Sequence, residues 1–405
     1  MAKVKIQGHA SGTGVLTVTA PNTSTDRTIT LPDATGTLLN SDGSGVSLTN
    51  VNAINGGRKN MVINGAMQVS QRQGTSSFAL TNDTFGIDRF KYVGQTSRLT
   101  SQQVTDSPAG FNYSYKLTSA GANTPSSSDG SGIWIQLEGD DVGHLNYGTS
   151  DAQTTTLSFW VKSSLTGTFG GSFGNGAINR SYPFTYAISS ANTWEKKSIT
   201  VAGDTTGTWV TTGNGYGLRI KINTGTGSNF NGSSAGSWTG ADRRDVSGTV
   251  QLEATSGATL QITGVQLELG STATDFEYRS YGEELALCQR YYEIVADASQ
   301  SSDGSIHYVC GGFSTKSDQV NWNYFFQVVK RGTFTLEATT GTDYYKAVNH
   351  SDNIVDTAVG MTASYQGLNC VNGYISGSYS GSTEGKAWQF TLNNASAKIA
   401  VSAEL

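Results

Sequence analysis

Aromatic side chains in loops are the residues of this sequence whose types and spacing best suit binding chemistry. Trp238 lies in the glycine- and serine-rich stretch GSNFNGSSAGSWTGADRRD, with Phe230 before it and Asp242 and Arg243 after it. A flat C–H face of a sugar ring packs well on an indole or phenol ring, while nearby polar groups bond its hydroxyls. The stretch therefore predicts a contact site for a glycan or a protein. The alternative is that Trp238 folds back and plugs one end of the fold.

The other aromatic residues divide into strand-like and surface-like groups. Trp134, Trp160 and Trp209 stand in strand-like patterns, where aromatic side chains mostly pack inward, so we expect them in the core. Tyr344 and Tyr345 form a second candidate ligand surface. Packing between copies of the chain is the alternative for these two tyrosines.

Catalytic and metal-binding patterns are weak. Glu138, Asp140 and Asp141 stand together in EGDDVGHLN, and two carboxylates about 5 to 10 Å apart can cleave a glycosidic bond. A solvated turn is the simpler interpretation, so we expect no enzyme. This run and the DGSG strings at Asp42 and Asp129 offer oxygens for a structural Ca²⁺, without the spacing of a calcium loop. The histidines show no paired spacing, and we expect no cofactor or metal.

The bulk composition excludes several classes of partner. Charged residues make up 14% of the 405 residues and the net charge is −5, with no basic stripe, so nucleic-acid binding is not expected. No apolar run approaches the roughly 20 residues that span a bilayer, and the first residues lack a secretory signal. Three scattered cysteines fit folding in a reducing cytoplasm.

Short strands separated by turns are the expected elements. The chain has 50 glycines and only 5 prolines, and apolar residues alternate with polar ones in segments such as GIWIQLEG, TTTLSFWVKSS and YGLRIKINTG. Eight or more such strands without helical periodicity predict an all-β antiparallel sandwich. A second all-β region follows from about residue 297. Residues 1–56 are expected to hold only very short strands, whose small apolar content suits a core shared between chains. A flexible N-terminal arm is the alternative.

One stretch, residues 262–293, marks a boundary between these regions. Val265, Leu267 and Leu269 alternate with polar residues as in a half-buried strand. The period then changes, because Leu285, Cys288, Tyr291 and Tyr292 recur at helical spacing after an acidic first turn. A sheet is therefore predicted to close here and a short helical connector to begin.

The same stretch carries a family resemblance. VQLELGSTATDFEYRSYGEELALCQRYYE resembles the closing strand and connector of many tailed-bacteriophage fibre and tail proteins, where it ends a jelly roll similar to carbohydrate-binding modules. NMVINGAMQVSQRQ is similar to the opening of that domain, and RTITLPDATGTLL resembles a motif of fibre shafts and attachment regions. The resemblance implies an N-terminal attachment and trimerisation segment (1–56), a jelly roll (57–280), a helical connector (281–296) and a C-terminal β-sandwich (297–405).

Two functions follow from the resemblance and remain open at this point. The first is a homotrimeric tail fibre that binds a host-surface glycan or protein non-covalently and joins other virion proteins through its N-terminal segment. The alternative is a head fibre, capsid decoration or collar protein without receptor binding. A glycan-degrading tailspike is less expected, since no periodic β-helix rungs occur. In each case the protein is made in the host cytoplasm and works on the virion, without entering a membrane.

Overall fold

The computed structural model of this chain describes residues 58–232, 234–300, 307–316, 319–349, 354–358, 362–376 and 384–405. The predicted attachment and trimerisation segment, residues 1–56, lies outside these residues, as does Asp42 of the calcium hypothesis. No helix in the described part of the chain is long and apolar enough to cross a membrane.

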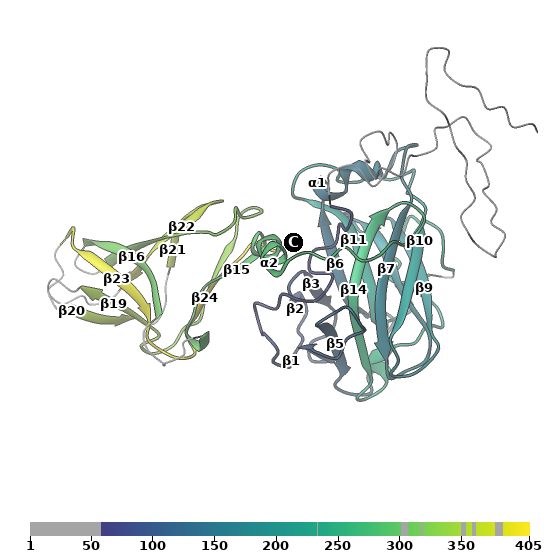
Figure 1. Ribbon diagram of the computed structural model, residues 1–405, viewed down its shortest axis with the longest axis horizontal. Coiled ribbons are helices and arrows are strands. Elements are labelled where there is room, and N and C mark those ends of the chain that lie inside the picture. The colour runs from purple at the N-terminus through teal and green to yellow at the C-terminus, as the bar shows by residue number, and fades with distance from the viewer. Residues whose placement is uncertain are drawn as a thin grey trace, which may run out of the picture. The chain divides into compact units, whose positions relative to one another are not determined.

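Two six-stranded sheets form a sandwich (Figure 1). The first, here called the β14 sheet, has the order β1 (Phe78–Ala79), β4 (Leu99–Val104), β5 (Ser114–Ser119), β14 (Thr259–Leu269), β7 (Thr155–Ser163) and β10 (Glu195–Val201). The second, the β11 sheet, has the order β2 (Thr84–Ile87), β3 (Phe90–Val93), β6 (Gly130–Glu138), β11 (Tyr216–Thr226), β8 (Gly167–Asn175) and β9 (Ser181–Ile188). All pairs within both sheets are antiparallel. This arrangement confirms the predicted all-β jelly-roll sandwich.

The core of the sandwich follows from alternation along each strand. In β11, Leu218, Ile220 and Ile222 are buried in the core between the sheets. Successive side chains of a strand point to opposite faces, so Arg219 and Lys221 lie on the outer face of the β11 sheet. The same rule separates core and surface residues on the neighbouring strands β6 and β8.

Strand β14 breaks this alternation at one point. Its pairing with β7 shifts register between Thr263 and Gln266, and Gly264 there has a φ of 62°. A β-bulge of this kind inserts an extra residue and bends the strand. A positive φ suits glycine because it has no Cβ. Core positions are therefore even-numbered before the bulge and odd-numbered after it.

A second β region follows the sandwich. Its three-stranded sheet has the order β15 (Tyr292–Asp297), β24 (Lys398–Ser402) and β18 (Thr335–Ala338). Its seven-stranded sheet has the order β20 (Ile354–Ala358), β19 (Tyr345–Asn349), β23 (Ala387–Leu392), β16 (His307–Lys316), β17 (Gln319–Phe325), β22 (Cys370–Ser376) and β21 (Thr362–Gly367). Trp322, Tyr345 and Phe390 are among the large side chains buried in its own core.

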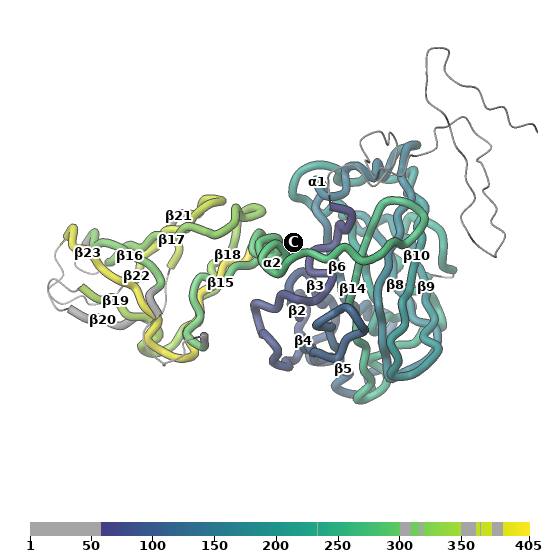
Figure 2. The backbone as a smooth tube through the Cα atoms, in the orientation of Figure 1, coloured from purple at the N-terminus to yellow at the C-terminus, as the bar shows by residue number. Residues whose placement is uncertain are grey.

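The connector between the two regions is a helix, α2 (Tyr281–Gln289), visible as the green coil in Figure 2. Ser280 caps it, because its hydroxyl accepts a hydrogen bond from the backbone N–H of Glu283. The helix is shorter than predicted: it ends at Gln289, and Tyr292 already belongs to β15. Tyr292 pairs with Ser402 of β24, and an aromatic side chain suits such a strand position.

Short elements complete the sandwich: α1 (Gly139–Val142), the 3₁₀ turns at Gly143–Leu145 and Leu252–Ala254, and the parallel pair β12 (Asn231–Gly232) and β13 (Asp245–Val246). A further 3₁₀ turn, Ala298–Gln300, follows β15. The segment after β11, which holds β12 and β13, folds back on the β11 sheet: Ser181 of β9 bridges Thr239, and the backbone N–H of Gly236 donates to Pro183. This fold-back covers part of the outer face of the β11 sheet.

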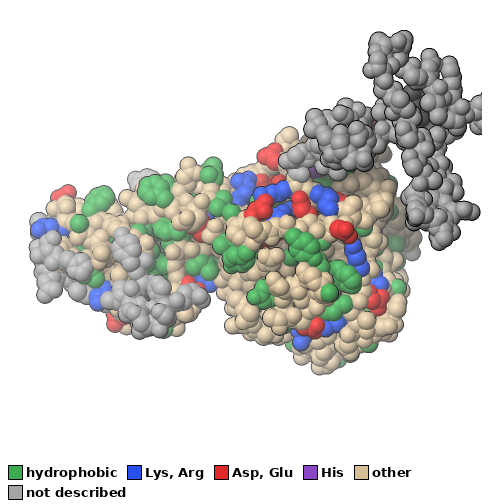
Figure 3. Space-filling model, viewed as in Figure 1, with side chains coloured by type: hydrophobic (Ala, Val, Ile, Leu, Met, Phe, Trp, Pro, Cys, Tyr) green, Lys and Arg blue, Asp and Glu red, His purple; other side chains and the backbone are tan. Residues whose placement is uncertain are grey.

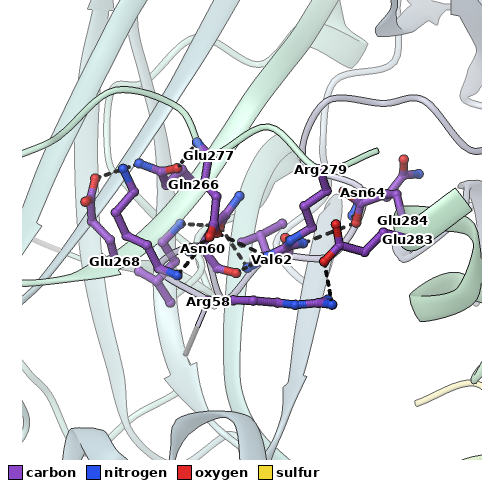
Figure 4. A network of polar contacts seen from close by, with 12 residues as sticks. Arg58, Asn60, Val62, Asn64, Gln266, Glu268, Glu277, Arg279, Glu283 and Glu284 are labelled. Atoms are coloured by element: carbon purple, nitrogen blue, oxygen red, sulfur yellow. Dashed lines mark hydrogen bonds and ion pairs between the residues drawn. The ribbon is translucent and has the colours of Figure 1, made fainter. Parts of the chain in front are cut away.

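A polar network joins the first described residues to the connector (Figure 4). The Arg279 side chain is buried and donates to the backbone oxygens of Asn60 and Val62. It also donates to Oε1 of Glu284 at 3.2 Å, and the same oxygen accepts from the backbone N–H of Asn64 at 2.6 Å. Arg279 and Glu284 thus hold the first described residues of the sandwich through buried charged side chains, in addition to apolar packing.

Candidate functional site

Three surfaces of the sandwich bring aromatic and polar side chains together. They are the Trp238 cluster (Tyr147, Tyr182, Trp209 and Trp238), the cationic row on the β11 sheet (Arg219, Lys221 and Arg244 around Trp134) and the aromatic strip on the β14 sheet (Phe111, Trp160, Phe276 and Tyr278). Figure 3 shows hydrophobic side chains exposed in patches among polar ones on one face of the molecule.

Trp238 packs within the first of these clusters. Its ring lies 5.8, 5.4 and 5.4 Å from the ring centroids of Tyr147, Tyr182 and Trp209, each edge to face. Its Nε1 donates to the backbone oxygen of Ala202 at 2.7 Å, and the side chain is half-buried against the sandwich core. The indole donor is therefore already used inside the protein. These contacts favour the plug over the platform, although part of Trp238 stays exposed.

Trp209 was expected inside a core strand and instead lies in the loop between β10 and β11. Its Nε1 donates to the backbone oxygen of Thr206 at 3.2 Å, and its ring meets Tyr147 at a centroid distance of 4.9 Å. Trp209 is thus anchored in its loop by a hydrogen bond and packs against the sandwich core from there.

The cationic row surrounds Trp134 of β6. Arg219 Cζ, Lys221 Nζ and Arg244 Cζ lie 5.5, 4.7 and 5.2 Å from the centroid of the Trp134 ring. A cation over an indole face is attracted by the ring quadrupole. Trp134 was expected in the core, but it is buried on the opposite face, while its strand neighbours Ile133 and Ile135 fill the core. Its burial comes from these cations and from the fold-back after β11.

Two of the residues predicted from the Trp238 loop belong to this row. Asp242 pairs with Lys221 Nζ at 2.8 Å and with Arg244 Nη2 at 2.9 Å. Phe230 lies 3.9 Å from Arg244 Cζ. Arg243 is not in the row, because its Nη1 donates to the backbone oxygen of Asn229 at 2.7 Å. The structure therefore separates the predicted loop site into the Trp238 cluster and the cationic row.

Burial perturbs the charge of the row. Burial lowers the pKa of Lys221 to about 8, although Asp242 acts in the opposite direction. Burial also lowers the pKa of Arg219, against the opposing influence of Tyr216 and Asp242. Lys221 and Arg244 share the single carboxylate of Asp242 and Arg219 lies beside them, so this part of an acidic protein carries excess positive charge.

The aromatic strip was not predicted. Phe111, Phe276 and Tyr278 lie with ring centroids 5.0 to 5.5 Å apart, and the Tyr278 side chain is 56% exposed. A Cβ at Gly264 would come within 2.6 Å of Phe111 and 3.1 Å of Trp160. The bulge in β14 therefore makes the space in which Phe111 and Trp160 meet. Trp160, expected in the core, is half-buried on the outer face instead.

Polar groups flank the strip. Lys162 follows Trp160 by two residues on β7 and so shares its face. Lys162 Nζ donates to Asp106, which also accepts from Trp194 Nε1 at 3.3 Å. The hydrogen bond from Lys162 outweighs desolvation and lowers the pKa of the Asp106 carboxyl. An exposed aromatic surface thus lies beside a charged donor, a carboxylate and an indole N–H.

The remaining predicted residues lie elsewhere. Tyr345, on β19, is buried and donates to the backbone oxygen of Thr339 at 2.6 Å, while Tyr344 is half-buried just before that strand. Glu138 is buried and paired with Arg290 at 2.8 Å. Burial disfavours its charge, but Arg290 outweighs burial and keeps the pKa of Glu138 below its usual value. Asp140 and Asp141 are exposed on α1.

No group of three or more metal-ligating side chains lies together within the described ranges. Asp129 accepts from Arg98 at 2.9 Å and from Gln95 at 3.2 Å, which explains its burial without an ion. The calcium hypothesis therefore stays without a carboxylate cluster in the described part of the chain.

Comparison with known proteins gives a likeness of fold alone. No family model matches the sequence, and none of the curated proteins matches it significantly. Solved structures that resemble the chain include the enzymatically active domain of bacteriophage CBA120 tailspike protein 4 (13% identity, TM-score 0.27), covering 52% of this chain and 21% of that one.

Carbohydrate-binding modules are among the similar structures. The structure titled "CBM4 structure and function" matches 52% of this chain over 99% of its own length, with 13% identity and a TM-score of 0.26. A family 11 module of Clostridium thermocellum in complex with a mixed-linked tetrasaccharide matches 50% of this chain over its full length, with 9% identity and a TM-score of 0.25.

Proposed function

We propose that this chain is a virion protein of a tailed bacteriophage whose jelly-roll domain binds a host-surface glycan without cleaving it. The observation that carries the proposal is the aromatic strip with its polar flank. Sugar rings stack on aromatic faces, and their hydroxyls require donors and acceptors beside the platform. The strip offers both on the outer face of the β14 sheet.

The geometry of the strip suits a chain of sugars. Trp160 and Phe111 meet over Gly264, and Phe276 and Tyr278 continue the surface. Lys162, Asp106 and Trp194 lie on one side of Trp160. Tyr278 is 56% exposed and lies among other rings, and exposed apolar patches of this kind mark interaction sites.

The virion role is supported by the sequence resemblance to phage fibre and tail proteins. In a homotrimeric fibre each copy brings one strip, and linked weak sites raise avidity by ~10²–10⁴. A decoration protein of the head or collar needs the same anchor and β-domains but no strip. The strip therefore favours receptor binding over decoration.

The proposal is tested with the full-length protein on a microarray of bacterial surface polysaccharides. We expect wild type to bind at least one glycan and Trp160→Ala to lose that signal at least tenfold with an unchanged melting temperature. Trp238→Ala is the matched control. It removes another half-buried indole, and because that ring packs on the core we expect a lower melting temperature and retained binding.

The opposite pattern would move the site. Binding that survives Trp160→Ala and is lost in a folded Trp238→Ala protein places the platform at the Trp238 cluster. A wild-type protein that binds no glycan and no host cells, together with antibody labelling on the phage head, would show decoration instead. Shortening of a bound polysaccharide would contradict the non-cleaving function.

A further inference from the structure

Arg219 has an unusual position on the outer face of the β11 sheet. Its side chain is only 5% exposed, yet it forms no hydrogen bond or ion pair with any residue in the described part of the chain. Its guanidinium lies between two rings, with Cζ 4.2 Å from the centroid of Tyr216 and 5.5 Å from that of Trp134. Of its three nitrogens only Nε is buried without a partner, so the two terminal nitrogens face solvent.

The neighbouring charges leave Arg219 without compensation. Asp242 is already bonded through Oδ1 to Lys221 and through Oδ2 to Arg244. Arg219 therefore adds a third cation beside a carboxylate that two others occupy. A guanidinium that is largely out of water without a counter-ion is unfavourable unless something outside the fold compensates it.

Unsatisfied polar atoms surround the same position. Gln136, the Cα partner of Arg219 on β6, is buried and its Oε1 lacks a donor. Ser172, the Cα partner of Lys221 on β8, is buried and its Oγ also lacks a partner. A buried polar group left without a partner costs about 1–3 kcal/mol, and native folds keep few of them. Two acceptors and one donor therefore await partners on adjacent strands.

We propose that Arg219 binds the carboxylate of an acidic sugar at the outer face of the β11 sheet. The two terminal nitrogens of a guanidinium match the two oxygens of a carboxylate, and the flanking rings hold the guanidinium plane in place. A hydroxyl group close to the carboxylate supplies the donor that Gln136 Oε1, on the strand next to Arg219, lacks.

The site requires a carboxylate and a hydroxyl donor close to it, and this combination favours a sugar acid over other anions. Acetate compensates the charge but brings no hydroxyl donor, and phosphate carries its only hydroxyls on the anionic centre itself. An acidic peptide side chain brings a carboxylate on a flexible stem, without the C4 hydroxyl that a uronic acid ring holds two carbons from its carboxylate. The site lies on the sheet opposite to the aromatic strip and stands independently of the proposed platform.

The experiment compares D-glucuronate with D-glucose, which has a CH₂OH group where glucuronate has the C6 carboxylate. Saturation-transfer difference NMR with the full-length protein detects weak binding by a large protein. We expect glucuronate to receive saturation from wild type and glucose to receive little. Arg219→Gln should reduce the glucuronate signal at least tenfold, and Arg219→Lys should lose most of it, because an ammonium keeps the charge without the planar fork.

Two controls separate this site from general electrostatics and from the strip. Arg58→Gln makes the same change in net charge at an exposed pair with Glu283 and should leave the glucuronate signal unchanged. Trp160→Ala should also leave it unchanged, so a failure of the glycan platform does not remove the predicted effect of Arg219.

Three outcomes would overturn the proposal. One is the absence of any glucuronate signal with the folded wild type, and another is an equal signal with Arg219→Gln. The third is displacement of glucuronate by acetate or inorganic phosphate at the same concentration, which would reduce the site to an unspecific anion contact. Circular dichroism of each variant confirms that the fold is intact.

Discussion

At the residue scale, Lys221 is a cation that the fold holds almost entirely out of water. Only 2% of its side chain is exposed, and burial lowers its pKa from 10.5 to about 8. Below pH 8 the lysine is protonated in both folded and unfolded chains, and the folded chain bears the penalty. Between pH 8 and 10.5 the unfolded chain binds more protons, so stability rises with pH in this window.

The prediction concerns the difference in unfolding free energy between wild type and Lys221→Met. As pH rises from 8 to 10.5, this difference should shift in favour of wild type by up to about 3 kcal/mol. Urea unfolding at pH 7.5, 9 and 10.5 measures it. Lys196→Met, at an exposed position of β10, is the control and should show no such trend. A difference for Lys221→Met that stays constant or falls as pH rises would show that burial does not lower the pKa of Lys221.

The candidate site was predictable at the level of single residues only in part. The stretch around Trp238 drew attention to Phe230 and Asp242, which lie beside Arg244 in the cationic row, and their role in ligand binding stays a prediction. Arg219 and Lys221 are two residues apart in YGLRIKINTG, with Ile220 between them, and this spacing predicts that both lie on one face of a strand. What the pattern cannot show is that Trp134 lies beside them, since this depends on the pairing register of β6 with β11, which sets Lys221 opposite Trp134.

At the element scale, the connector depends on a buried ion pair. Arg279 and Glu284 have side chains only 4% exposed and bond to backbone groups of the opening segment. Arg58 and Glu283, next to them, form a pair that is 43% and 40% exposed. The two pairs have similar chemistry and different burial, so they allow a matched comparison.

Arg279→Met should destabilise the sandwich by roughly 3–5 kcal/mol, because it leaves Glu284 as a buried charge without its cation. Arg58→Met should change stability by no more than about 1 kcal/mol, since exposed pairs contribute little. Denaturant unfolding of both variants measures the contrast. Equal effects, or a tolerated Arg279→Met, would show that the network is not what holds the connector. The double variant Arg279→Met, Glu284→Gln should recover part of the loss.

The elements themselves were largely predictable, and their ends were not. Alternation of apolar residues located β6, β7, β11 and β14, because one face of each strand meets the core. Helical spacing correctly began α2 near Tyr281 but extended it through Tyr292. Tyr291 and Tyr292 are both buried, which is compatible with either a helix or a strand. Only the pairing of Tyr292 with β24 decides between the two.

At the scale of the whole molecule, assembly remains a prediction. The two sheets end at β10 and β9 on one side of their strand orders, and at β1 and β2 on the other. Edge strands invite pairing unless they are covered. The small apolar content of residues 1–56 in the sequence suits a core shared between chains, and we expect a homotrimer that is held together in this segment.

Light scattering of the full-length protein should give three times the monomer mass. A protein lacking residues 1–57 should be monomeric and keep its melting temperature within a few degrees, because the sandwich has its own core. A full-length monomer would contradict the fibre model. A truncated protein that stays trimeric would locate the contacts in the described domains instead.

Strand β11 also has a consequence for how such a protein diversifies. Its even-numbered residues Leu218, Ile220 and Ile222 fill the core between the sheets, and its odd-numbered residues Arg219 and Lys221 lie almost fully buried on the opposite face. The two faces of one strand therefore carry separate constraints, shape between the sheets and charge compensation on the other side. A lineage can vary the charged set by changing every second codon while the residues between the sheets stay constant.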